Sequence, residues 1–380
     1  MAYFDNNATT SLGLDALQAY QSALAEDWYN PSSPYRSSSR VRAKMEKIRN
    51  ELAESFGLKK EDIIFTSGAT EANNAVFAHS ASVAKQGSSC LLSPFEHPSI
   101  FEPANHWFKD QVYYLPIDKD GRVEIENIEK ILEKDNISIV SLMAANNETG
   151  VLQPWKEMAQ ICATKGIHFH CDATQWIGKL NSNDFSLCSS FSASAHKFSG
   201  PKGVGWLACK GPIRLQLGGE QERSRRGGTE NYPAIISMCT AWQNIQTVLS
   251  SNNERAEWRN RFEENMLNVI PGVKFLGLNN PRLWNTSMFV LPHFENLSWV
   301  GKLDKIGYSV STGSACSTGK VEHSAMASSM SLSNSEVRRL IRVSSYLEQN
   351  ECDWENLALA FEQANIELHE DASNSSVISI

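Results

Sequence analysis

A lysine stands among small residues in the stretch Ser194-Ala195-His196-Lys197-Phe198-Ser199-Gly200, and a carboxylate, Asp172, ends an earlier apolar run. Pyridoxal phosphate enzymes need two such groups, because the amine forms a Schiff base and the carboxylate pairs with the pyridinium nitrogen. Taken singly, Lys197 is more simply a surface lysine and Asp172 a strand-end aspartate. Their occurrence together, with the motifs that follow, predicts a pyridoxal phosphate site.

Short apolar runs alternate with helix-like stretches on both sides of these two residues. The runs cover residues 63–66, 90–93, 112–117, 137–144, 167–172, 190–193 and 203–208. This alternation predicts an α/β fold with a mostly parallel sheet, in which ligands bind beyond the carboxyl ends of the strands. Polar residues that follow the runs can therefore converge on one crevice. They are Thr70, His97, Asn147, Asp172 and Lys197.

Composition narrows the classes of protein to which the chain can belong. The 380 residues are 41% hydrophobic and carry a net charge of -8, with no long run of Lys and Arg, so direct binding to nucleic acid is not expected. The sequence has no apolar N-terminal segment and no apolar run of membrane-spanning length. We expect a cytoplasmic protein without membrane contact.

The segment Ser67-Gly68-Ala69-Thr70-Glu71-Ala72-Asn73-Asn74 follows the first apolar run and opens a helix-like stretch. Amide groups and a threonine hydroxyl at a helix N-terminus can bind a phosphate group. Thr70 also suits an ordinary helix cap, which is the simpler explanation of the segment by itself.

Cysteine usage points to one reactive thiol. The eight cysteines are scattered, without a Cys-x-x-Cys pair or zinc-like spacing, so we expect neither disulfides nor a metal site. Cys316 lies in the small-residue segment Ser311-Thr312-Gly313-Ser314-Ala315-Cys316-Ser317-Thr318-Gly319, which predicts a flexible, exposed loop. The other seven cysteines lie mostly in apolar or helical contexts that predict inert thiols. An incidental loop cysteine is the alternative for Cys316.

From Tyr3-Phe4-Asp5-Asn6-Asn7-Ala8-Thr9-Thr10 to the Cys316 segment, the chain resembles the cysteine desulfurases of the NifS/IscS type, within the class V aminotransferase group. The resemblance implies the fold of fold type I pyridoxal phosphate enzymes. In that fold, a large domain with a mostly parallel seven-stranded sheet carries a small α+β C-terminal domain. We expect the large domain at residues 15–250, the small domain at 1–14 and 251–369, and a mobile tail at 370–380.

The resemblance also assigns cofactor contacts by position. Residues on the phosphate side are Ala69, Thr70, Ser194, His196 and, reaching from the neighbouring subunit of a homodimer, Thr229.

Around the ring, Asp172 holds the pyridine nitrogen, while Gln175 and Asn147 match contacts near the phenolic oxygen. His97 matches the histidine that stacks on the ring and relays protons. By itself, His97 would more simply be structural and Asn147 a turn former.

The chemistry that the resemblance implies is the conversion of L-cysteine to L-alanine. Lys197 removes the Cα proton, and the Cys316 thiolate takes the substrate sulfur as a persulfide for an acceptor protein. Arg342 matches the arginine that binds the substrate carboxylate, for which a bidentate guanidinium suits better than an ammonium, and Asn147 lies with it on the substrate side.

Two segments depart from the family pattern. Ser344-Ser345-Tyr346-Leu347 replaces the usual Ser-Leu-Gly-Arg, and the C-terminal residues do not resemble the tail that docks an iron-sulfur scaffold. Thio-modification of tRNA or DNA is therefore as plausible a pathway as iron-sulfur assembly. Two rival functions are a selenocysteine lyase of the same fold and a scaffold that has lost catalysis, against which the intact Lys197, Asp172, His97 and Cys316 argue.

Overall fold

The structure, a computed structural model, describes residues 1–134, 136–247, 249, 252–313 and 325–377. Its main feature is a seven-stranded sheet with the strand order β2-β8-β7-β6-β5-β3-β4. All neighbouring pairs are parallel except those of β8, which is antiparallel to both β2 and β7. The predicted mostly parallel seven-stranded sheet is therefore confirmed. The strands are β2 Ile63–Thr66, β3 Ser89–Leu92, β4 Val112–Tyr114, β5 Ile137–Ser141, β6 His168–Asp172, β7 Ser190–Ser194 and β8 Gly205–Cys209.

Helices cover both faces of this sheet, which explains why its strands are continuous apolar runs in the sequence. Side chains alternate between the faces: Ile63 and Phe65 join a core with helices α2, α6 and α8, whereas Ile64 joins another core with α3 and α4. The helices of this part are α1 Leu14–Glu26, α2 Arg36–Ser55, α3 Ala69–Val83, α4 Pro98–Phe108, α5 Ile128–Lys134, α6 Trp155–Lys165, α7 Gln221–Ser224 and α8 Tyr232–Gln246, with 3-10 turns at Lys60–Asp62, Lys109–Gln111, Asn183–Leu187 and Ala195–Lys197.

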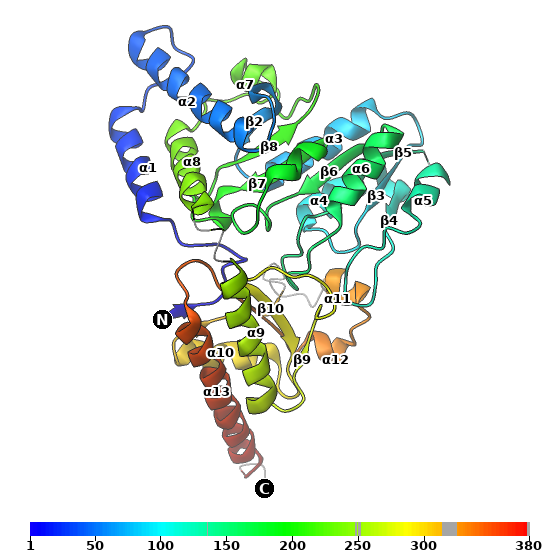
Figure 1. Cartoon of the computed structure of the whole chain (residues 1–380), viewed down its shortest axis with the longest axis vertical. Helices are drawn as coiled ribbons and strands as arrows, with labels where there is room; N and C mark the ends of the chain where they lie inside the picture. The colour runs from blue at the N-terminus through cyan, green and yellow to red at the C-terminus, as the bar shows by residue number, and fades with distance from the viewer. Residues whose placement is uncertain (135, 248, 250–251, 314–324, 378–380) are drawn as a thin grey trace.

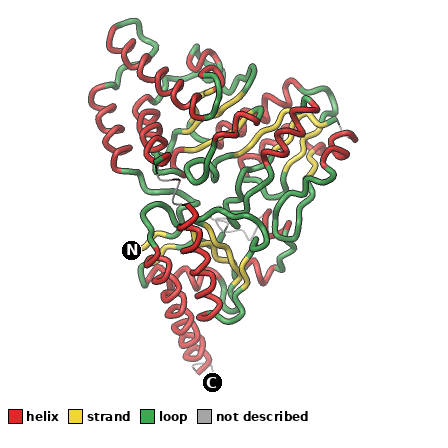
Figure 2. The backbone as a smooth tube through the Cα atoms, in the orientation of Figure 1, coloured by secondary structure: helices red, strands yellow, loops and turns green. Residues whose placement is uncertain are grey.

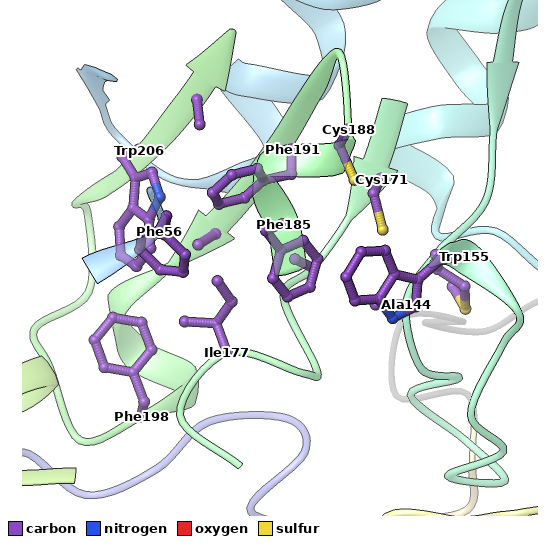
Figure 3. Packing of buried hydrophobic residues seen from close by; sticks show 14 of the residues in the cluster. Phe56, Ala144, Trp155, Cys171, Ile177, Phe185, Cys188, Phe191, Phe198 and Trp206 are labelled. Atoms are coloured by element: carbon purple, nitrogen blue, oxygen red, sulfur yellow. The ribbon is translucent and has the colours of Figure 1, made fainter. Parts of the chain in front are cut away.

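Aromatic rings fill the core on the α2, α6 and α8 face (Figure 3). Trp155 of α6 stacks on Phe185 with ring centroids 4.2 Å apart, and Phe191 of β7 lies 5.0 Å from Phe185. Phe56, which follows α2, continues the cluster toward Trp206 of β8. This packing holds β6, β7 and β8 in place, and the residues that follow β6 and β7 include Lys197.

The C-terminal part builds a second core around a small antiparallel sheet. Strand β10 (Thr286–Val290) lies between β9 (Lys274–Phe275) and β12 (Leu340–Ser344). Helices α9 (Asn252–Val269), α10 (Asn296–Lys305) and α13 (Glu351–Val377) pack with it, and α11 (Ala325–Ser329) and α12 (Asn334–Val337) are short.

The N-terminus belongs to this second core. Strand β1 (Ala2–Tyr3) pairs in parallel with β11 (Tyr308–Ser309), and Phe4 packs against Trp354 of α13, with ring centroids 5.1 Å apart. In Figure 1 the N-terminus accordingly lies beside the C-terminal helices. The boundaries at residues 14 and 250 stay a prediction, which this separate core supports.

Helix α13 continues through Glu370 to Val377, so most of the segment for which we expected a mobile tail is helical. Figure 2 shows this helix running outward to the C-terminus. Within the described residues, none of the helices, α13 included, has the length and apolar composition needed to cross a bilayer.

Gly205 of β8 lets the sheet approach the start of α3. A Cβ at this position would lie 2.3 Å from the carbonyl oxygen of Ala193 and 2.8 Å from the Cα of Gly68, both of which are backbone atoms that cannot move aside. The strand therefore requires glycine for close approach rather than for an unusual φ.

Gly205→Ala should destabilise the protein by about 1–3 kcal/mol, because the added methyl group forces β8 away from β7 and from the start of α3. Urea denaturation followed by circular dichroism measures this change. Gly301→Ala is the matched control: a Cβ there meets nothing within 4 Å, on the exposed face of α10, so the free energy of unfolding should stay the same or rise. Equal effects of both substitutions would contradict the argument.

Candidate active site

A cavity of about 460 Å³ opens beyond the carboxyl ends of β6 and β7. It brings together most of the residues that we singled out in the sequence. Those that line it are Ala69, Thr70, His97, Asp172, Ser194, His196 and Lys197. Gln175, Asn147, Arg342 and Thr229 do not line it.

The start of helix α3 forms one wall of this cavity. Gly68 is the N-cap, with a φ of 150°, and within the described part of the chain no side chain caps the helix, so Thr70 does not act as the ordinary cap. Ser67, Gly68, Ala69 and Thr70 all line the cavity. The first-turn amide groups are therefore available to an anion bound there.

Asp172 ends β6 and is 7% exposed. Its Oδ1 accepts a hydrogen bond from the amide of Thr174 at 3.0 Å, and its Oδ2 accepts one from Nδ2 of Asn73 at 2.9 Å. Two donors therefore fix the carboxylate from the protein side. The orientation suits a carboxylate that receives a further donor from a ligand in the cavity.

Asn73 is oriented in turn by His170. The Nε2 of His170 lies 2.9 Å from Oδ1 of Asn73, and its Nδ1 lies 2.9 Å from the hydroxyl of Ser190. His170 is fully buried, and this burial lowers its pKa to about 3, so it is a neutral ring that donates from Nε2. A buried chain of hydrogen bonds from Ser190 through His170 and Asn73 thus orients the Asp172 carboxylate.

The same chain reaches His97, the N-cap of α4. Asn73 Nδ2 donates to the hydroxyl of Ser99 at 2.9 Å, and this hydroxyl lies 2.9 Å from Nδ1 of His97. The amide of Ser99 donates to the same Nδ1, which places the proton of the neutral ring on Nε2. Burial lowers the pKa of His97, and the charge of Asp172 opposes this effect.

Lys197 is held by the N-terminal arm, which we define as residues 5–13. Its Nζ donates to the carbonyl oxygens of Asn7 and Ala8, each at 2.7 Å. The arm is fastened to the lysine loop nearby, since the amide of Thr10 donates to the carbonyl of His196 at 2.8 Å and the amide of Gly13 donates to that of Ser199 at 3.0 Å. The amine of Lys197 therefore has a defined place at the edge of the cavity.

Gln175 and Asn147 lie behind this arm. Gln175 Nε2 donates to the carbonyl of Asn7 at 3.0 Å, and Nδ2 of Asn7 donates to the carbonyl of Asn147 at 3.1 Å. Their predicted contacts with the cofactor stay predictions. The structure places both residues in one network with Lys197.

Arg342, at the centre of β12, is 2% exposed and ion-paired with Asp5 at 2.5 Å. Its Nη1 also donates to the carbonyl of Asn147 at 3.0 Å, and its Nε has no acceptor among the described residues. The predicted role in binding the substrate carboxylate stays a prediction, and Asp5 would have to share the guanidinium.

Thr229 is exposed and lines a second cavity, of about 180 Å³. Ser67 and Gly203 line both cavities, so the two are adjacent. The glycine-rich loop that carries Thr229 is tied to α3, because Nε of Arg226 lies 2.9 Å from Oε1 of Glu71. Cys316 lies outside the described residues, and its role stays a prediction.

Sequence reasoning missed Asn7, Asn73, Ser99 and His170. Asn7, Asn73 and Ser99 each bind a predicted site residue, and His170 binds Asn73. None of the four stands in a sequence pattern with a recognisable chemical meaning. Asn73 lies within the predicted phosphate segment and Asn7 within the first motif of the resemblance, and these positions were the available signals.

The buried histidine makes stability depend on pH. The pKa of His170 lies below its ordinary value, so the unfolded state binds the extra proton, and stability falls as pH drops from about 6.5 toward 3. In His170→Gln, the slope of unfolding free energy against pH, measured by urea denaturation between about pH 6 and 5, should fall by about 1 kcal/mol per pH unit. The same substitution at exposed His106 should leave the slope unchanged, and an unchanged slope in His170→Gln would contradict the prediction.

Known proteins share both the sequence and this architecture. The chain is 36% identical over 338 residues to cysteine desulfurase IscS of Dictyoglomus turgidum, covering 87% of this chain and 86% of the relative. It is 33% identical over 365 residues to cysteine desulfurase NifS of Azotobacter vinelandii, covering 92% and 90%. A solved structure described as NifS-like protein, 30% identical, matches with a TM-score of 0.87 over 95% of this chain and 98% of that chain. The model of the family described as Aminotransferase class-V matches residues 2–357, and the chain belongs to that family.

Proposed function

We propose that this protein is a pyridoxal phosphate-dependent cysteine desulfurase, which converts L-cysteine to L-alanine and passes the sulfur to an acceptor protein. The observation that carries the proposal is one cavity lined by the amine of Lys197, the carboxylate of Asp172 and the imidazole of His97. The relatives named cysteine desulfurase supply the substrate class.

The residues of the cavity fit pyridoxal phosphate. Its volume of about 460 Å³ lies within the range of cofactor sites. The uncapped start of α3 suits the phosphate. The buried hydroxyl of Thr174, which lines the cavity, has no hydrogen-bond partner among the described residues. When bound, the cofactor supplies an electron sink for negative charge that develops at the substrate Cα.

Lys197 and Asp172 have separate tasks in this proposal. The Nζ of Lys197 would take the Cα proton, and the carbonyl groups of Asn7 and Ala8 would accept hydrogen bonds from the resulting ammonium. With the cofactor bound, the carboxylate of Asp172 would hold a proton on its pyridine nitrogen. His97, neutral with its proton on Nε2, can exchange one proton with the substrate sulfur or Cα.

Cys316 accepts the sulfur. Its thiolate attacks the substrate sulfur, an S–S bond forms as the C–S bond breaks, and the electron pair of that bond stays with the substrate carbon, which is protonated to give alanine. The persulfide then carries the sulfur to the acceptor. Among the described cysteines, six are buried and Cys352 is exposed. Of these seven thiols, Cys352 alone is therefore accessible enough to accept the sulfur in place of Cys316.

We further propose a cytoplasmic homodimer in which Thr229 of one subunit reaches the phosphate site of the other. Thr229 is exposed, as a residue that reaches a neighbouring subunit must be. Either iron-sulfur assembly or thio-modification of nucleic acid would be served through the acceptor protein.

Lys197→Ala should abolish the visible absorption band of the purified, yellow protein, because this amine forms the covalent link to the cofactor. Absorption spectra after gel filtration measure the loss. Lys202→Ala is the matched control, since Lys202 also lines the cavity, and it should keep the band. An unchanged band in Lys197→Ala would place the link on another lysine.

Cys316→Ser should bind pyridoxal phosphate normally but form no persulfide, because only sulfur transfer needs the thiol. Mass spectrometry of the wild type after incubation with L-cysteine should find one added sulfur on the peptide that contains Cys316, with alanine released when a reductant is present. Cys352→Ser, at the exposed helical thiol, should behave like the wild type. Added sulfur on another cysteine, or full turnover by Cys316→Ser, would contradict the assignment.

A further inference from the structure

The dipeptide Gly178-Lys179, which follows β6, is a junction that the proposed mechanism does not use. The side chain of Lys179 is completely buried, with 0% exposed. No acidic side chain is ion-paired with it among the described residues. A lysine in such a place is unusual, because burial of an unpaired cation is costly and an apolar side chain of the same length would avoid the cost.

The amine of Lys179 binds two amide oxygens. Its Nζ donates to Oδ1 of Asn7 at 2.8 Å and, through a short contact, to Oε1 of Gln175. An amide side chain has one oxygen and one nitrogen, so a donor on the oxygen side decides where the nitrogen points. Lys179 therefore fixes the orientation of the Gln175 amide.

The nitrogen of that amide lies beside the reactive lysine. Gln175 Nε2 donates to the carbonyl oxygen of Asn7 at 3.0 Å, and Nζ of Lys197 donates to the same oxygen at 2.7 Å. Nε2 carries two hydrogen atoms, and this bond uses one of them. Among the hydrogen bonds of the described residues, the second is not used.

The main-chain carbonyl groups of Gly178 and Lys179 accept hydrogen bonds from side chains of the C-terminal part. The carbonyl of Lys179 accepts from the indole N–H of Trp284 at 2.9 Å and from Nδ2 of Asn252 at 2.6 Å. The carbonyl of Gly178 accepts from the hydroxyl of Tyr346 at 3.2 Å. Tyr346 lies in the segment 344–347, where the sequence departs from the family pattern.

We propose that Lys179 is a positioning residue for the cofactor. Its buried amine binds the side-chain oxygen of Gln175 and so directs the amide nitrogen to the Asn7 carbonyl, which Lys197 also binds. Without this amine, only the carbonyl of Asn7 would orient the Gln175 amide, whose predicted contact is the phenolic oxygen of the cofactor. This inference rests on the proposed function, because it concerns the binding of pyridoxal phosphate.

A double-mutant cycle on the dissociation constant of pyridoxal phosphate tests the proposal, with apoprotein titrated and followed by absorbance. Lys179→Met and Gln175→Ala should each weaken binding about tenfold, the loss expected for one hydrogen bond in a buried site. The double variant should bind no more than about twofold more weakly than Gln175→Ala alone, because Lys179 acts through Gln175. Independent effects that multiply to about a hundredfold would overturn the proposal.

A second variant, Gln175→Glu, tests the proposal without depending on how well Lys179→Met folds. This variant keeps an oxygen toward Lys179 but lacks the Nε2 donor, so it should lose affinity as Gln175→Ala does, and wild-type affinity would overturn the proposal. Lys156→Met is the control: Lys156 lies on the surface of α6, paired with Asp184, and its loss should leave the dissociation constant unchanged. Absence of pyridoxal phosphate binding by the wild type would refute the proposed function itself, which separates the two failures.

Discussion

The carbonyl oxygen of Asn7 is the constraint on which the site depends. It accepts hydrogen bonds from the amine of Lys197 and from the amide of Gln175, so one atom of the N-terminal arm aligns two groups that follow different strands. The arm can do this because its ends are fixed independently. The amide of Asn7 donates to the Ser344 hydroxyl in the C-terminal part, and Thr10 binds the lysine loop. Movement of the C-terminal part would therefore shift Asn7 and, with it, the amine of Lys197.

A second polar network joins the end of β6 to helices α3 and α4 and supports the site. Asp172 and His97 line the same cavity, and hydrogen bonds through Asn73 and Ser99 join them. Because His170 beneath them is neutral, the network positions the carboxylate without adding a charge that would compete with a bound ligand. The first network positions the amine of Lys197, and the second positions the carboxylate of Asp172 and the imidazole of His97.

Much of this arrangement follows from sequence alone, for an identifiable reason. The strands of a parallel sheet are buried on both faces, so the apolar runs mark them within a few residues, as for 63–66 and β2. Residues after the runs then meet at one edge, and Thr70, His97, Asp172 and Lys197 do line one cavity. The helical continuation of α13 to Val377 was not predictable from composition, since Ser and Asn at its end are typical of loops.

The sequence by itself determined the α/β sheet, the place of the cavity and the set of groups around it, because periodicity and strand ends are local properties of the chain. Only the tertiary structure decided how these groups are held. The carbonyl of Asn7 binds Lys197 across 190 positions of sequence, Asp5 pairs with Arg342 across 337, and the amine of Lys179 binds Asn7 across 172. Such contacts use main-chain atoms and ordinary polar side chains, which carry no pattern of their own, and they exist only once packing has brought the two ends of the chain to the same edge of the sheet.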